Sequence, residues 1–455
     1  MLVNTLRKLG QDHIASLISS DGDPSVKARI TRDLEGVDMD LVLRLMRGEG
    51  LYIPPLGVVE PAHVIPASFA STEEADTYIR HGLELLRKGK VAALTVAGGQ
   101  GSRLGIDAPK GTVGVTPLKA KSLFSLFSEK ILALQMKHQC SIEWFIMTSR
   151  ENDGATKEYF RDNGWFGLKV HQVHFFVQGM LPSITPEGRF IMAEDGGLFM
   201  NPDGHGGTFS ALHKSGSLDL MKDMGIQEIF YFQVDNPLVK ICDPLFIGLH
   251  SLGGAQMSSK VVRKASYDEK VGVITTMNGR TSLLEYSDMS DEVRFAKGPD
   301  GTMLHWAGNL AIHMIRRSFA QEITAQGLRL PFHRARKMIT AKGPGGELEE
   351  TPGIKFETFL FDALPLAEKS ITLEVLREEE FAPVKNLTGT DSLESSRQLQ
   401  SALHASWLKN IGTQVDPGVV IEISPLFALD CEDLLQKAST LPGRIDQNTY
   451  LGGRS

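Results

Sequence analysis

Residues 91–111 read VAALTVAGGQGSRLGIDAPKG, a short apolar run followed by a glycine-rich turn. The apolar run at 91–97 is rich in β-branched residues and ends at glycines, which predicts a buried strand. Four glycines then allow sharp turns and a close approach of a ligand to backbone N–H groups: Gly98, Gly99, Gly101 and Gly105. Arg103 and Lys110 add two cations beside this loop. A glycine loop with cations suits a polyphosphate, because it offers N–H donors and positive charge together.

Two better-known glycine motifs do not fit this loop. The dinucleotide pattern G-x-G-x-x-G requires glycine where Leu104 stands, and the P-loop pattern requires glycine directly before the lysine, where Pro109 stands. The glycines alone would also fit an ordinary strand-to-loop turn with surface cations.

Composition limits the class of protein. A chain of 455 residues exceeds what one hydrophobic core usually serves, so we expect two or three domains. The hydrophobic content of 42% and charged content of 23% are typical of a soluble globular protein. The net charge of −7 argues against a nucleic-acid-binding surface. Three separated cysteines and the lack of a long N-terminal apolar run predict a cytoplasmic protein without a membrane span.

The hydrophobic pattern after the glycine loop alternates between helix and strand. Residues 122–138 predict a helix capped by Ser122, and 144–148 and 173–177 predict strands. The run at 228–234 predicts another strand, and Asn278-Gly279 predicts the turn of a hairpin. This order indicates an α/β fold with a mostly parallel sheet, in which ligands bind at the carboxyl ends of the strands.

Three segments divide the chain. We expect an N-terminal helical segment at 1–50, a main domain at 51–388 that contains the glycine loop, and a small C-terminal domain at 389–455 to which we assign no chemistry. Residues 71–89 predict a helix with Ser71 as its cap, and 208–223 predict a helix after a glycine-rich loop.

The motifs resemble one family. The loop at 98–110 resembles the signature of nucleotide-sugar pyrophosphorylases of the uridylyltransferase type, and is most similar to the eukaryotic-type UDP-N-acetylhexosamine pyrophosphorylases. Further elements of the same resemblance are QGMLP at 178–182, NPDGHGG at 201–207, VDN at 234–236, EYSD at 285–288, AGN at 307–309, GIKFETFLFD at 353–362 and REEEFAPVKN at 377–386. The resemblance implies a Rossmann-like, GT-A-like fold: a mostly parallel central sheet flanked by helices. It also implies that 51–388 is a nucleotidyltransferase catalytic domain.

The resemblance also implies a reaction and its residues. The family joins UTP to a sugar 1-phosphate and releases pyrophosphate, with Mg²⁺. The implied catalytic residues are Arg103, Lys110 and Lys355, and the implied metal ligand is Asp235. The implied nucleotide-binding residues, besides Lys110 and Asp235, are Ala97, Gly98, Gly99, Gln178 and Gly204. Those implied for the sugar phosphate are His205, Glu285, Tyr286, Asn309 and Lys385. Taken singly, most of these polar residues would also fit turns, strand ends or surface positions.

One residue leaves the sugar open. His205 stands where the acetylhexosamine enzymes usually have Asn and the UDP-glucose and broad UDP-sugar enzymes usually have His. The other motifs favour N-acetylglucosamine 1-phosphate, which we expect as substrate, whereas His205 favours the alternative of glucose 1-phosphate or a broad sugar range. A catalytically dead sugar-nucleotide sensor and a Rossmann-type oxidoreductase are the alternatives from other classes. We expect a monomer or weak homo-oligomer with no nucleic-acid or membrane partner.

Overall fold

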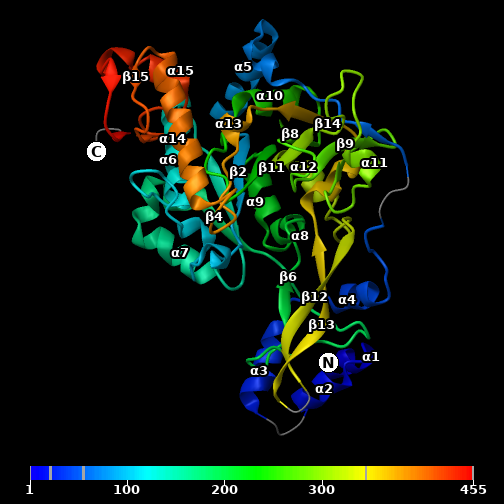
Figure 1. The fold of residues 1–455 in the computed structure, drawn as a ribbon. Coiled ribbons are helices and arrows are strands. Elements are labelled where there is room, and N and C mark those ends of the chain that lie inside the picture. Colours follow the sequence, from blue (N-terminus) through cyan, green and yellow to red (C-terminus); the bar gives the residue numbers. More distant parts are fainter. Residues whose placement is uncertain (1, 20–22, 54–56, 344–345, 453–455) are drawn as a thin grey trace. The chain divides into compact units, whose positions relative to one another are not determined.

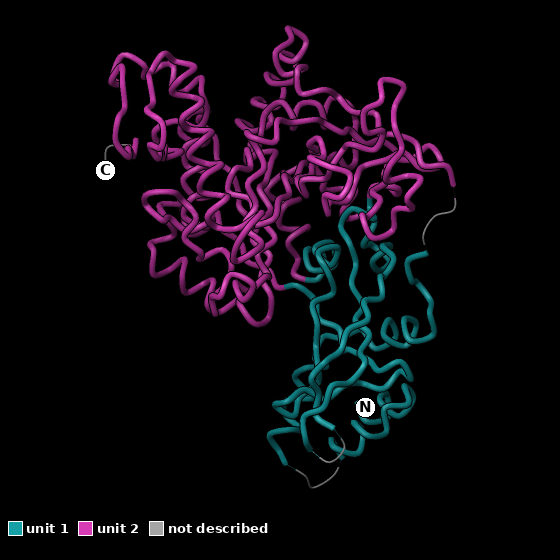
Figure 2. The backbone as a smooth tube through the Cα atoms, in the orientation of Figure 1, with its two compact units in different colours: residues 1–56, 178–214, 323–363 teal, residues 57–177, 215–322, 364–455 magenta. Residues whose placement is uncertain are grey.

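The computed structural model describes residues 2–19, 23–53, 57–343 and 346–452 (Figure 1). The chain divides into two compact units (Figure 2). The smaller unit comprises residues 1–56, 178–214 and 323–363, and the larger unit comprises 57–177, 215–322 and 364–455. The three segments predicted from the sequence stay a prediction. None of the helices in the described ranges combines the length and apolar character needed to cross a bilayer.

Four parallel strands form one half of the sheet in the larger unit. They are β7 (Glu228–Gln233), β2 (Val91–Val96), β3 (Glu143–Thr148) and β4 (Val173–Val177), in that spatial order. Strand β2 is buried along almost its whole length, as its apolar sequence predicted. The carboxyl ends of these parallel strands share one edge, so the glycine loop after β2 and Asp235 after β7 begin at the same edge.

The other half of the sheet is mixed. Strand β11 (Ala307–Arg316) pairs antiparallel with β7 and with β8 (Met257–Arg263), and β14 (Ser370–Glu374) runs parallel to β8. Strands β9 (Val273–Met277) and β10 (Arg280–Leu284) form the predicted hairpin, and β1 (Val59–Pro61) pairs with β9. The hairpin turn is confirmed at Asn278 and Gly279, which both have positive φ angles.

Helices surround this sheet. They are α5 (Glu73–Arg87), α6 (Leu123–His138), α7 (Asp153–Asp162), α9 (Ser217–Asp223), α10 (Pro244–Leu252), α11 (Asp291–Arg294), α12 (Arg317–Glu322) and α13 (Arg377–Glu380). Ser122 caps α6 as predicted, because its hydroxyl accepts the N–H of Ser125 at 3.1 Å. The predicted cap at Ser71 is wrong: Thr72 caps α5 by accepting the N–H of Ala75 at 3.3 Å. The predicted α/β class, with helices around a largely parallel central sheet, is confirmed.

The last part of the larger unit has a small core of its own. Helix α14 (Leu393–Asn410) is followed by β15 (Gln414–Val415), β16 (Ile421–Ile423), α15 (Cys431–Leu435), β17 (Arg444–Ile445) and β18 (Thr449–Leu451). Strands β15 and β17, and β16 and β18, form two short parallel pairs. Leu408, Ile421 and Leu434 are fully buried in this core.

The smaller unit combines helices with a long two-stranded ribbon. Helices α1 (Leu2–Lys8), α2 (Asp12–Ser19), α3 (Pro24–Asp33) and α4 (Met39–Met46) pack on β5 (Met180–Pro182), β6 (Met200–Pro202) and the base of the ribbon, which is formed by β12 (Phe332–Lys342) and β13 (Leu348–Thr358). Helix α8 (Gly207–Lys214) also belongs to this unit. The single helix predicted at 208–223 is wrong, because Gly216 has a φ of +76° between α8 and α9.

Candidate active site

The glycine loop begins where β2 ends. The N–H of Ala97 donates to the carbonyl of Met147 at 2.8 Å, which extends the sheet by one residue. The buried Asn152 side chain donates from Nδ2 to the carbonyl of Ala97 at 2.9 Å and more weakly to that of Gly99 at 3.4 Å. Asn152 therefore sets the path of the loop, and the sequence analysis missed it. Its position soon after β3, at the same sheet edge, was the available signal.

The loop closes on itself before Lys110. The N–H of Gly101 donates to the carbonyl of Ala108 at 2.9 Å, and the N–H of Lys110 donates to that of Gly99 at 3.1 Å. A Cβ on Gly111 would lie 2.1 Å from the ring of Phe124, so only glycine fits directly after Lys110. The loop thus brings Lys110 back to the carboxyl end of β2, where the loop begins.

Lys110 and Asp235 face each other at this edge. The distance between Lys110 Nζ and Asp235 Oδ2 is 3.6 Å, and their side chains keep 17% and 12% of their exposure. Asp235 lies two residues beyond β7, which is the neighbour of β2. Parallel pairing of β7 and β2 therefore brings together two groups 125 residues apart in the sequence.

The segment carrying Lys385 is bound to the Asp235 segment. The N–H of Val384 donates to the Asp235 carbonyl at 2.8 Å. The Asn236 side chain donates to the Glu380 carbonyl at 2.6 Å and accepts the N–H of Ala382 at 3.1 Å. Lys110, Asp235 and Lys385 consequently belong to one region of the larger unit.

Asp391 lies close enough to this region for the pKa of its carboxyl to depend on Lys385 and Asp235. Burial raises the pKa of its carboxyl, and Lys385 opposes that rise, while the negative charge of Asp235 adds to it. The backbone of Lys385 is fixed to this residue, because its N–H donates to the Asp391 carbonyl at 2.6 Å.

Arg103 lies in the short turn Ser102–Leu104 and is exposed. Within the described residues it makes no ion pair, so its guanidinium is available to a ligand. Its predicted role stays a prediction.

Three of the residues predicted to bind the sugar phosphate, Glu285, Tyr286 and Asn309, lie near the end of the hairpin and the start of β11. The N–H of Asn309 donates to the Gly272 carbonyl at 2.9 Å, and its Oδ1 accepts the N–H of Ala311 at 3.2 Å. A Cβ on Gly272 would lie 3.3 Å from Glu285 Oε1, so Glu285 and Asn309 both flank that glycine. Tyr286, the next residue, is 38% exposed.

In the smaller unit, Gln178 is held by two acceptors. Its Nε2 donates to the Gly204 carbonyl at 2.7 Å and to Asp203 Oδ1 at 3.2 Å. Both N–H groups of the amide are therefore used, and the amide oxygen remains as the group offered to a ligand. Burial raises the pKa of Asp203 to about 7, although the hydrogen bond from Gln178 lowers it. The sequence analysis missed Asp203, which a glycine-framed loop could have indicated.

His205 is packed between aromatic rings of the same unit. Its ring stacks on Phe359 with centroids 5.4 Å apart, and its Nδ1 accepts the N–H of Leu360 at 3.2 Å. Burial lowers the pKa of His205 to about 4, with the nearby His333 adding to the effect, so the imidazole is neutral at pH 7. With Nδ1 accepting, the proton resides on Nε2, which can donate to a hydroxyl.

Lys355 lies on β13 of the smaller unit. Its Nζ lies 5.6 Å from the centre of the Phe199 ring, and burial and Lys337 lower its pKa. Lys110, Asp235 and Lys385 belong to the larger unit. The convergence of all four charges on one ligand therefore stays a prediction.

Metal binding at this site would depend on the nucleotide. No cluster of three or more His, Cys, Asp or Glu side chains suited to a metal occurs among the residues that the structure describes. Asp235 is a single carboxylate, and Mg²⁺ is commonly held by one or two carboxylates together with substrate phosphates and water. The donor set fits a Mg²⁺ ion that arrives with a triphosphate, with Asp235 as its protein ligand.

Comparison with known proteins supports the resemblance drawn from the motifs. A family model described as UTP–glucose-1-phosphate uridylyltransferase matches residues 66–446. The chain is 35% identical to UDP-N-acetylglucosamine diphosphorylase 1 of Arabidopsis thaliana, over 95% of this chain and 90% of the relative. It is 34% identical to UDP-N-acetylglucosamine pyrophosphorylase of Saccharomyces cerevisiae, over 95% and 92%. The crystal structure of the UDP-N-acetylglucosamine pyrophosphorylase of Trypanosoma brucei with an inhibitor matches with a TM-score of 0.84 at 26% identity, over 99% of this chain and 98% of that one.

Proposed function

Because the chain belongs to the UTP–glucose-1-phosphate uridylyltransferase family, we propose that it joins UTP to N-acetylglucosamine 1-phosphate and releases pyrophosphate. The relatives named as N-acetylglucosamine enzymes match at least nine-tenths of both chains, which supports this sugar. The observation that carries the proposal is the Lys110–Asp235 pair at 3.6 Å beside the glycine loop. It offers a cation and a metal-binding carboxylate at the edge of the sheet where ligands bind.

The reaction is an in-line displacement. A phosphate oxygen of the sugar 1-phosphate attacks the α-phosphorus of UTP, the bond from that phosphorus to the β-bridging oxygen breaks, and pyrophosphate leaves with the electron pair. No covalent bond to the protein forms. Such a reaction depends on positioning and charge neutralisation. Mg²⁺ held by Asp235 would supply charge neutralisation at the α-phosphate.

The cations have separate roles in this reaction. Lys110 and Arg103 neutralise the pyrophosphate as it leaves, since both lie on the glycine loop. Lys385 and Lys355 bind the attacking phosphate and lower its repulsion with UTP. These side chains act by position and charge, because the displacement itself transfers no proton.

The nucleotide base is read by backbone groups and one amide. Ala97, Gly98 and Gly99 supply backbone contacts, and Gln178 offers its oxygen because both of its N–H groups are held by Asp203 and Gly204. An outward-facing oxygen accepts the N3–H of uracil, whereas N3 of cytosine has no hydrogen to donate.

The residues proposed to select the sugar are His205, Glu285, Tyr286 and Asn309. The neutral His205 can donate from Nε2 to a hydroxyl, and Glu285 and Asn309 flank Gly272. His205 supports glucose 1-phosphate as the second candidate, because UDP-glucose enzymes usually have histidine there. A broad sugar range is the third.

Steady-state pyrophosphate release tests the proposal. UTP is paired in turn with the 1-phosphates of N-acetylglucosamine, glucose, N-acetylgalactosamine and galactose, and kcat/KM is compared. We expect the highest value for N-acetylglucosamine 1-phosphate, and Asp235→Asn serves as the inactive control. A higher value for glucose 1-phosphate moves the assignment to that sugar. Tight UDP-sugar binding without turnover identifies a sensor instead of an enzyme.

The cellular compartment and the oligomeric state are separate proposals. The three cysteines Cys140, Cys242 and Cys431 are all free, which supports a reducing cytoplasm. We propose a monomer or weak homo-oligomer, which light scattering at several protein concentrations tests. Cell fractionation tests the compartment.

A further inference from the structure

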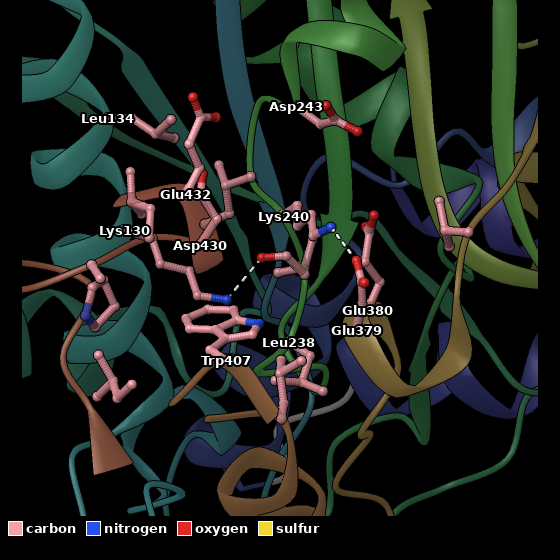
Figure 3. A pocket seen from close by; sticks show the side chains of 18 of the residues that line it. Lys130, Leu134, Leu238, Lys240, Asp243, Glu379, Glu380, Trp407, Asp430 and Glu432 are labelled. Atoms are coloured by element: carbon pink, nitrogen blue, oxygen red, sulfur yellow. Dashed lines mark hydrogen bonds and ion pairs between the residues drawn. The ribbon is translucent and has the colours of Figure 1, made fainter. Parts of the chain in front are cut away.

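A cavity of about 750 Å³ in the larger unit is lined in part by the segment that follows β7 (Figure 3). Four lysines line it, and three of them bind carboxylates: Lys121 binds Glu129 at 2.5 Å, Lys137 binds Asp433 at 2.6 Å and Lys240 binds Glu379 at 2.6 Å. The fourth, Lys130 on α6, forms no ion pair within the described part of the chain. Its amino group instead donates hydrogen bonds to backbone carbonyls.

Lys130 holds two carbonyls of the segment that carries Asp235. Its Nζ donates to the carbonyl of Pro237 at 2.6 Å and to that of Val239 at 2.8 Å. Pro237 and Val239 are buried, and across the described residues no other donor reaches these two oxygens. Buried carbonyls need a hydrogen-bond partner, so this one ammonium satisfies both.

Few other hydrogen bonds restrain the segment 235–239. The Asn236 side chain ties it to Glu380 and Ala382, and the Asp235 carbonyl accepts the N–H of Val384. Pro237 has no N–H of its own, and the N–H of Val239 reaches only the nearby Asn236 carbonyl at 3.3 Å. Leu238 and Val239 pack in apolar clusters, and among the described residues Lys130 supplies the hydrogen bonds that link the part of this segment beyond Asn236 to the body of the unit.

We propose that Lys130 is a positioning residue for the reaction, because it fixes the backbone that aims the Asp235 carboxylate towards Lys110. This inference rests on the proposed function of Asp235 as the metal carboxylate. Leaving a buried carbonyl without a donor is costly, so the two hydrogen bonds from Nζ restrain the segment. A displacement of about 1 Å at a reacting group can reduce a rate by roughly 10²-fold.

The surroundings of Lys130 agree with this role. Burial lowers the pKa of Lys130 to about 7, Glu380 opposes that change and Lys240 adds to it. Burial lowers the pKa of His404, which faces the same cavity, and Lys130 adds to that effect. Burying the Lys130 amino group without a carboxylate partner costs free energy, and its two hydrogen bonds to carbonyls offset that cost.

The test compares two lysines of the same cavity wall. Lys130→Met keeps the apolar length of the side chain and removes both carbonyl contacts. Lys240→Met is the matched control, because it removes a partly exposed ion pair with Glu379 and leaves both carbonyl contacts of Lys130 in place. We measure kcat, KM for UTP and the Mg²⁺ concentration for half-maximal rate, at a temperature where circular dichroism shows each variant folded.

The expected result is a separation of kinetic constants. In Lys130→Met, kcat falls and the half-saturating Mg²⁺ concentration rises, each by about 10-fold or more, while KM for UTP changes by less than about threefold. Lys240→Met stays within about twofold of the wild type. Lys130→Arg recovers most of kcat, because its several N–H donors can reach both carbonyls and the cavity has room for them.

A Lys130→Met protein that is less stable but keeps wild-type kcat and Mg²⁺ dependence would show a purely structural role and overturn the inference. If Lys130→Met does not fold, Lys130→Gln replaces it: its nitrogen ends one bond short of reaching both carbonyls, so the same changes are expected.

Failure of the proposed function gives a different pattern. If the wild type turns over no sugar 1-phosphate, Mn²⁺ binding in the presence of UTP is followed by electron paramagnetic resonance. Lys130→Met must weaken that binding, with Asp235→Asn as the positive control, or the inference falls. If the wild type is active and Asp235→Asn is inactive but Lys130→Met is normal, only the inference is wrong.

Discussion

Replacing Lys110 by methionine removes the charge that faces Asp235 and leaves the loop geometry intact. Coulomb's law with an effective dielectric constant of about 20 gives roughly 4–5 kcal/mol for unit charges at the observed 3.6 Å. The two side chains keep 17% and 12% of their exposure, so water and salt reduce this to about 2–4 kcal/mol. If Lys110 approaches a phosphate oxygen as closely as it approaches Asp235, the variant should lose about 30- to 1,000-fold in rate.

The assay is single-turnover formation of UDP-N-acetylglucosamine with enzyme in excess over UTP, which separates the chemical step from product release. Circular dichroism and thermal unfolding should match the wild type, because Lys110 is at the loop surface of the site. Lys88→Met, which removes an exposed lysine paired with Glu84 on α5, is the control and should react at the wild-type rate. A folded Lys110→Met protein that reacts within threefold of the wild type would refute the assignment of Lys110 to the reacting phosphates.

Three further changes test other parts of the account. Gly82→Ala places a Cβ 2.0 Å from the Pro244 carbonyl oxygen and should lower the free energy of unfolding, measured in urea, by about 1–3 kcal/mol. In the control Gly154→Ala on α7, the new Cβ meets no atom within 4 Å, so the free energy of unfolding should not fall. Equal effects of the two substitutions would contradict the packing argument. Burial raises the pKa of Asp203, so the folded state binds more protons than the unfolded state between about pH 4 and 7, and the free energy of unfolding falls as pH rises through that window. In denaturant titrations, the free energy of unfolding of Asp203→Asn should rise relative to that of the wild type by about 1–3 kcal/mol between pH 5 and 8. A difference that stays constant with pH would contradict the burial of this carboxyl. Lys385→Met should raise KM for the sugar 1-phosphate by about 10-fold or more with KM for UTP nearly unchanged, and equal changes in both would remove Lys385 from the sugar-phosphate side.

Local patterns in the sequence predicted local structure well. The strand at 91–97, the Ser122 cap and the Asn278-Gly279 turn depend on residues within a few positions of one another, so the sequence alone determined them. The boundary errors were equally local. Thr72 replaced its neighbour Ser71 as a cap, and Gly216 divided one expected helix into two.

Residues whose role depends on distant partners were missed. Asn152 acts on a carbonyl 55 residues away, and Asp203 orients Gln178 across 25 residues. Lys130 contacts carbonyls 107 and 109 residues away. In the sequence each looks like an ordinary turn or surface residue, because its importance comes from how the strands and helices are packed. The charged residues on motifs were found because the resemblance singled them out, although their division between two units was not foreseen.

The most direct test of the central claim is a crystal structure of the protein with UTP, Mg²⁺ and an unreactive phosphonate analogue of the sugar 1-phosphate. The account predicts that Asp235 coordinates the metal and that the nitrogens of Lys110, Lys385 and Lys355 each lie within about 4 Å of a phosphate or phosphonate oxygen. Nucleotide bound away from the loop at 98–110, or Lys355 and Lys385 remote from every phosphate, would contradict it.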